Sequence, residues 1–122
     1  MPNEFQTKSD QAWTQGKRCL EEGDSNSAAN RVYYSVLQAV LGFAWAKGEL
    51  PRGGDLSTHK RIFDVAAKYD NSASKSFRDT ILRLAGFRVM ADYRAEDVPA
   101  ERLEGVLSDA QRVRGHFIQN CR

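Results

Sequence analysis

The segment from Ser27 to Lys47 constrains the fold of this chain more than any other. Its apolar residues recur at steps of three and four, which is the spacing of one face of an α-helix. These residues are Ala29, Val32, Tyr33, Val36, Leu37, Val40 and Ala44. We therefore expect this segment to be a single helix in the centre of the core. A second helical face carries Arg31, Tyr34, Ser35 and Gln38, which a core helix does not require.

The rest of the chain predicts four further helices separated by glycine, proline and serine. They are expected at about residues 3–22, 59–68 and 75–90, and from Pro99 onward. Gly23 is a candidate C-terminal cap of the first helix. Candidate N-terminal caps are Ser25 or Ser27, Ser57 or Thr58, and Ser74. No strand-like alternation of useful length occurs. The prediction is an all-α, single-domain bundle of about five helices over residues 1–122.

Composition excludes several classes of function. A net charge of +2 on 122 residues does not by itself favour nucleic-acid binding, although a local basic cluster can bind phosphate. The two cysteines, Cys19 and Cys121, do not resemble a zinc site or a disulfide framework, and the two histidines are far apart. We therefore expect no metal or cofactor. The most apolar window, residues 36–46, is too short to span a membrane, and no signal peptide is visible, so a cytoplasmic protein is expected.

The predicted fourth helix carries a charged pair on its apolar face. Its stripe of Ile81 and Ala85 continues into Arg88 and Asp92, which are spaced i, i+4. One interpretation is an internal ion pair that ties the helix end to its neighbours. The other is a polar site in which the Arg88 guanidinium binds an anion such as phosphate.

Two other positions have the same pair of interpretations. Arg31 is either the partner of a nearby acid such as Asp92 or part of a polar site, and Tyr34 is either packing or part of that site. His59 opens the third predicted helix beside two basic residues. Because helix starts attract anions, His59 is either a phosphate or proton-transfer residue or an ordinary surface histidine.

Three motifs, taken in order, resemble small prokaryotic HEPN-domain proteins. They are ANRVYY at residues 29–34, STHK at 57–60 and RVMADY at 88–93. The resemblance covers nearly the whole chain. It implies a helical, commonly dimeric, nucleotide-binding domain that is often encoded beside a minimal nucleotidyltransferase, with some members acting as ribonuclease toxins or in defence. The site residues that it implies are Arg31, Tyr34, His59, Arg88, Asp92 and Tyr93.

The chain departs from the ribonuclease members of that family at one point. Those members carry an arginine followed, after four to six residues, by a histidine, whereas the matching positions after Arg88 hold Tyr93, Arg94 and Ala95. The first hypothesis is therefore a homodimeric module that binds a nucleotide or RNA phosphate. It would act with a nucleotidyltransferase partner in a toxin–antitoxin or defence role. The alternatives are a metal-independent ribonuclease using Arg88 and His59, and a non-catalytic helical adaptor with internal ion pairs.

Overall fold

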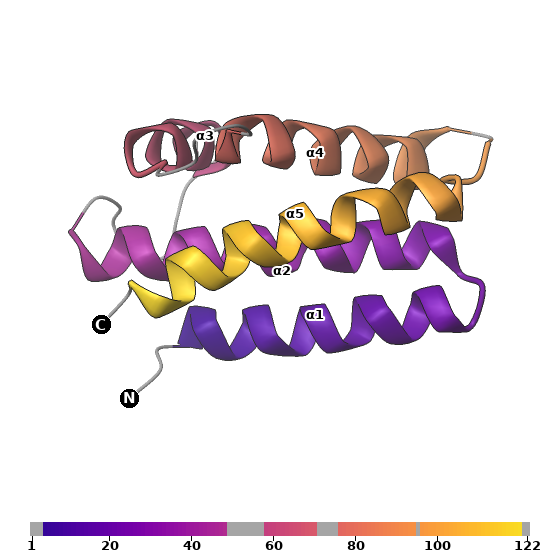
Figure 1. Ribbon diagram of the computed structural model, residues 1–122, viewed down its shortest axis with the longest axis horizontal. Helices are drawn as coiled ribbons and strands as arrows, with labels where there is room; N and C mark the ends of the chain where they lie inside the picture. The colour runs from indigo at the N-terminus through magenta and orange to yellow at the C-terminus, as the bar shows by residue number, and fades with distance from the viewer. Residues whose placement is uncertain (1–3, 49–57, 71–75, 95, 121–122) are drawn as a thin grey trace.

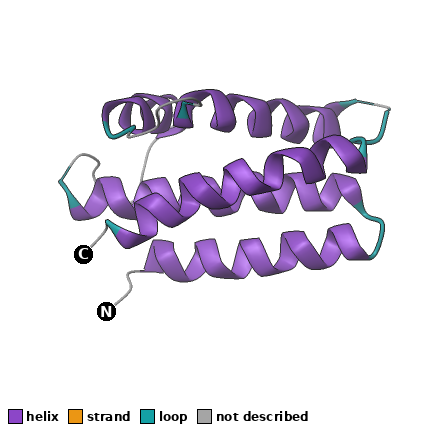
Figure 2. Ribbon diagram, viewed as in Figure 1, coloured by secondary structure: helices purple, strands orange, loops and turns teal. Residues whose placement is uncertain are grey.

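The described part of the chain forms five helices in the computed structural model (Figure 1). The structure describes residues 4–48, 58–70, 76–94 and 96–120, without the side chains of residues 58–61 and 63. Within these residues all the regular secondary structure is helical, as the prediction stated (Figure 2). The helices are α1 Glu4–Glu21, α2 Ser25–Ala46, α3 Thr58–Lys68, α4 Phe77–Tyr93 and α5 Ala100–Gln119.

Helix α2 lies at the centre of the bundle, in agreement with its apolar pattern. It packs against all four other helices, with α1 and α4 on opposite sides and α5 crossing it (Figure 1). The apolar face of α2 that the sequence predicted is buried, and Val40 and Ala44 have no exposed surface at all. Burying such a face removes apolar surface from water, which is the main driving force of folding. The core therefore forms around α2.

The start of α2 differs from the predicted caps, and the start of α3 excludes one of its two candidates. Asp24, rather than Ser25 or Ser27, caps α2, because its Oδ1 accepts a hydrogen bond from the Ser27 amide at 3.0 Å. Gly23 has a φ of 83°, which turns the chain directly into the α2 start two residues earlier than predicted. Helix α3 begins at Thr58 itself, and Ser57 lies outside the described residues.

The start and end of α4 also lie later than predicted. The Ser76 Oγ accepts from the Asp79 amide at 2.9 Å and caps the helix, whereas Ser74 lies outside the described residues. At its other end α4 continues past Met90 to Tyr93. The RVMADY motif therefore belongs entirely to one helix, and Arg88 and Asp92 are one turn apart on it.

The contact between α1 and α2 is close because of Gly16. A Cβ at this position would lie 3.0 Å from the Val32 Cγ2 atom and 3.3 Å from the Arg31 Cβ atom. Further along the same pair of helices, the Ser9 hydroxyl donates to the Ser35 carbonyl oxygen at 2.6 Å. The backbone of α2 is therefore held against α1 on the side from which Arg31 projects.

Polar side chains hold α5 and the connection before it against α1 and α2. On α5, the half-buried Arg114 forms an ion pair with Asp10, bonds to the Ser9 hydroxyl at 3.0 Å and covers the Trp13 ring. Burial lowers the pKa of Arg114, and the Asp10 carboxylate partly opposes that shift. Near the α2 start, Asn26 accepts a hydrogen bond from the Val98 amide at 2.9 Å. That bond ties the connection before α5 to α2.

No described helix has the length and apolarity to cross a membrane.

Candidate nucleotide-binding groove

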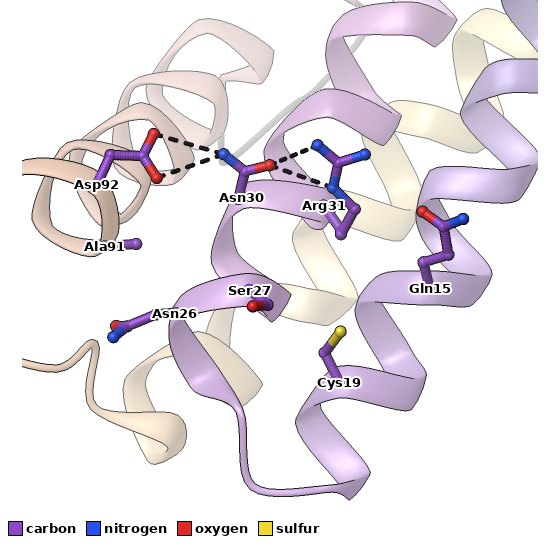
Figure 3. A pocket seen from close by; sticks show the side chains of 8 residues that line it. All are labelled: Gln15, Cys19, Asn26, Ser27, Asn30, Arg31, Ala91 and Asp92. Atoms are coloured by element: carbon purple, nitrogen blue, oxygen red, sulfur yellow. Dashed lines mark hydrogen bonds between the residues drawn. The ribbon is translucent and has the colours of Figure 1, made fainter.

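The candidate site lies on the side of α2 that its neighbours do not cover completely. Partly exposed side chains recur along this side at steps of three and four, at Asn30, Arg31, Tyr34 and Gln38. Helix α1 borders this stripe on one side, and the last turns of α4 border it on the other (Figure 3). The second face of the central helix is thus the floor of a groove.

Two arginines lie against the ring of Tyr34. The Arg31 guanidinium lies 5.5 Å from the ring centroid, and the Arg88 guanidinium lies 5.7 Å from it. Arg88 also lies 5.3 Å from the ring of Tyr33. Guanidinium groups are attracted to the negative face of an aromatic ring within about 6 Å. The tyrosine pair therefore holds both cations beside one groove.

Burial changes the pKa of Tyr33, the other tyrosine in contact with Arg88. Tyr33 is 3% exposed, and its ring meets that of Tyr34 edge-on with centroids 5.5 Å apart. Burial raises the pKa of the Tyr33 phenol, the Arg88 charge lowers it, and Tyr34 raises it. The phenol is consequently neutral near pH 7 and does not offset the two arginine charges.

A chain of hydrogen bonds links α4 to Arg31 (Figure 3). The Asn30 amide nitrogen donates to both Asp92 carboxylate oxygens, at 3.5 and 3.4 Å. The Asn30 oxygen accepts from the Arg31 Nε and Nη2 atoms, at 3.1 and 2.6 Å. Asp92 is also 3.7 Å from the Arg88 Nε atom. In the described part of the chain, Arg31 and Asp92 thus meet through Asn30, and not as the direct ion pair that one interpretation required.

The charges of the arginine cluster do not balance. This cluster consists of Asn30, Arg31, Tyr33, Tyr34, Arg88 and Asp92. Two guanidiniums, which stay protonated in proteins, face one carboxylate, that of Asp92. The Arg88 Nε is buried and has no hydrogen-bond partner among the described residues. Positive charge in excess, presented as planar donor groups, suits a phosphate or carboxylate oxygen.

A hollow of about 460 Å³ adjoins the cluster. Residues from three helices line it, as Figure 3 shows: Gln15, Cys19, Asn26, Ser27, Asn30, Arg31, Ala91 and Asp92. We call it the α4 groove. Of the two charged residues that line it, Arg31 is half-buried and Asp92 is exposed, so both reach solvent. Solute therefore has access to the cluster.

The structure brings four of the six expected site residues together: Arg31, Tyr34, Arg88 and Asp92. Tyr93 ends α4 with 74% of its surface exposed and does not line the groove. The side chain of His59 lies outside the described residues. Its helix, α3, lies toward the end of the bundle that holds the termini, whereas α4 ends toward the opposite end (Figure 1).

Sequence reasoning missed two members of the cluster. Asn30 stood inside the ANRVYY motif, but a neutral amide beside an arginine gave no signal of its own. Tyr33 was assigned to the apolar face alone, although a buried ring can still hold a cation over its face, as it does Arg88. Among the described residues, no three histidine, cysteine or acidic side chains gather as metal ligands would.

The fold and the groove define this chain as a small all-α bundle domain with a positively charged cluster beside a surface hollow. A family model described as HEPN domain matches residues 5–120. The chain therefore belongs to the HEPN domain family, as its three motifs indicated. No curated protein and no solved structure matches the chain.

Proposed function

We propose that this HEPN domain binds the phosphate of a nucleotide or of an RNA strand at the arginine cluster. The observation that carries the proposal is the pair of guanidiniums, Arg31 and Arg88, on the Tyr34 ring beside a solvent-accessible groove. Two positive charges held against the same ring repel each other, and a bound phosphate relieves that repulsion. We further propose that the domain works as a homodimer with a minimal nucleotidyltransferase partner, in a toxin–antitoxin or defence role.

Each residue of the cluster has a distinct part in this proposal. Arg88 and Arg31 supply donors to phosphate oxygens, and Tyr34 sets the distance between the two guanidiniums. Asn30 orients Arg31 through two hydrogen bonds, and Asp92 orients Arg88 across one helical turn. Orientation before binding lowers the entropy that a ligand must otherwise spend on ordering these side chains.

Replacing Arg88 tests the proposal directly. Hydrogen bonds to charged groups contribute about 1.5–3 kcal/mol each. Arg88→Ala should therefore weaken binding of fluorescently labelled single-stranded RNA, measured by anisotropy, by at least tenfold. The matched control is Arg83→Ala on the same helix, whose side chain is 52% exposed and lies 3.9 Å from Asp109. It should leave affinity nearly unchanged.

Circular dichroism of the Arg88→Ala variant separates binding from folding. A helical spectrum and a melting temperature close to those of the unchanged protein, together with lost binding, support the proposal. Collapse of the fold, with no binding of RNA or nucleotide by the unchanged protein, would favour the helical adaptor. The accessible groove beside Arg31 and Asp92 already weighs against internal ion pairing.

The ribonuclease alternative makes a different prediction. In metal-independent cleavage the RNA 2′-hydroxyl attacks the adjacent phosphorus and the 5′-oxygen leaves. A general base must take the hydroxyl proton, or a general acid must protonate the leaving oxygen, beside the phosphate-binding cation. RNA cleavage in the presence of a metal chelator, abolished by His59→Ala, would establish that alternative and replace simple binding.

A further inference from the structure

A second hollow adjoins the first on the same face. It measures about 250 Å³ and lies between α1 and α2. Its lining consists of Lys8, Gln11, Ala12, Gln15, Arg31, Tyr34 and Gln38. We call it the α1 groove. It shares Gln15 and Arg31 with the α4 groove. The two hollows therefore adjoin each other along Gln15 and Arg31.

The antiparallel pairing of α1 and α2 places both grooves along one line. Cys19 lines the α4 groove with Ser27, and Lys8 lines the α1 groove with Gln38. On each helix the two residues are eleven positions apart, which corresponds to about 16 Å. In a single strand, stacked nucleotides rise about 3.4 Å each. The α4 groove and the α1 groove together form one trough. This trough is therefore long enough for several nucleotides.

The chemistry of the α1 groove differs from that of the arginine cluster. Among its lining residues are two cations, three glutamine amides and one aromatic ring, and none carries a carboxylate. The Gln38 Oε1 is buried and accepts no hydrogen bond from the described residues. Amides pair with the hydrogen-bonding edges of unpaired bases, and aromatic rings stack on base faces.

We infer that the ligand of this domain is a single-stranded RNA segment of several nucleotides, which runs from the arginine cluster along the α1–α2 seam. Lys8 contacts a second phosphate, and the Gln38 amide contacts a base edge. This inference rests on the proposed function and extends it, because a mononucleotide would occupy only one of the two hollows. An acidic peptide would match the cations but would leave the three amides without bases to read.

Length dependence is the first test. The probes are labelled RNA strands of ten and two nucleotides of mixed sequence, and ATP as the mononucleotide. We expect the ten-nucleotide strand to bind at least tenfold more tightly than the dinucleotide or ATP. Equal affinity for all three probes would overturn the inference. Displacement of the ten-nucleotide strand by poly-glutamate at equal charge would also overturn it.

A charge reversal in the α1 groove is the second test. Lys8→Glu should weaken binding of the ten-nucleotide strand about tenfold and leave binding of ATP unchanged. It should also reduce the slope of log affinity against log salt by about one. The matched control is Lys17→Glu, an exposed lysine on the same helix that lines neither groove. If both variants weaken binding equally, the effect is one of net charge and the inference fails.

The outcomes separate this inference from the function on which it rests. If Arg88→Ala abolishes binding of every probe while Lys8→Glu changes none, phosphate binding stands and the extended site does not. If the unchanged protein binds no probe at all, both proposals fail. Gln38→Met, which keeps the volume and removes the amide, should alter preference among ten-nucleotide strands of different base composition. An unaltered preference removes Gln38 from the site.

Discussion

At the scale of single residues, Tyr33 and Tyr34 are neighbours in sequence with different surroundings. Tyr33 points into the core and is 3% exposed, whereas Tyr34 is partly exposed and lines the α1 groove. Both rings contact Arg88. Successive helical residues project about 100° apart, so one side chain can join the core while the next forms the groove floor. Tyr33 and Tyr34 thus place Arg88 between the core and the candidate site, because one ring belongs to each.

Tyr33 gives the protein a pH dependence at the alkaline end. Burial raises the pKa of its phenol above the ordinary value of 10.0, so the folded chain retains a proton that the unfolded chain loses. Stability from this group is complete below pH 10 and is lost as the pH rises through the folded pKa. The free energy of unfolding should fall there by up to about 1.4 kcal/mol per pH unit.

Urea denaturation between pH 8 and 11.5 measures this effect. Tyr33→Phe should remove that part of the decline, because phenylalanine keeps the ring but has no proton to lose. Tyr93→Phe, at a residue that is 74% exposed, serves as the control and should follow the unchanged protein. Identical curves for all three proteins would contradict the assignment to Tyr33.

At the scale of elements, the pairing of α1 with α2 decides the shape of the candidate site. Both grooves take one wall from α1, and Gly16 sets how closely that wall approaches Arg31 and Val32. Interhelical distance follows from the side chains at the contact, and a position without a Cβ allows the closest approach. The width of the trough therefore depends on one glycine.

Gly16→Ala should destabilise the fold by about 1–2 kcal/mol. Its Cβ would lie 3.0 Å from Val32 Cγ2 and 3.3 Å from the Val32 backbone nitrogen, and such overpacking costs about 1–3 kcal/mol. The gain in helix propensity, up to about 1 kcal/mol, offsets part of that cost. Gly105→Ala on α5 is the control, since nothing lies within 4 Å of its Cβ.

Thermal unfolding compares the two alanine variants. The control should be more stable than the unchanged protein by up to about 1 kcal/mol, from propensity alone. If Gly16→Ala is equally stabilising, the contact between α1 and α2 is looser than the structure has it.

At the scale of the whole molecule, charge is distributed unevenly. The chain has a net charge of only +2, yet Lys8 and Arg31 line one trough, and Arg88 lies against the ring of Tyr34, which lines it as well. Local excess, rather than total charge, determines where an anion concentrates. Binding at the trough should for this reason weaken as salt is added, although the protein as a whole is close to neutral.

The proposed homodimer is tested on the intact protein. Sedimentation equilibrium should give twice the chain mass of 13.7 kDa at micromolar concentration. A mass equal to one chain at all concentrations up to 100 μM would remove the homodimer from the proposal. It would leave phosphate binding in place, because the arginine cluster is complete within one chain.

Much of this protein follows from its sequence alone. The five helices, the central place of α2 and the two polar stripes are local patterns, because helical periodicity acts over a few residues. Arg31, Tyr34, Arg88 and Asp92 could accordingly be singled out in advance. The limits of α2 and α4 were less accurate, since Asp24 and Ser76 competed with neighbouring serines as caps.

Only the tertiary structure decided which partner each polar residue meets. Asn30 joins Arg31 to Asp92, which is 62 positions away from Asn30 in the sequence. Tyr34 contacts the guanidinium of Arg88 on another helix as well as that of Arg31 on its own. The α1 groove likewise exists only because α1 and α2 pair in one register. Such contacts depend on how helices pack, and packing is set by side-chain shape throughout the core rather than by any local pattern.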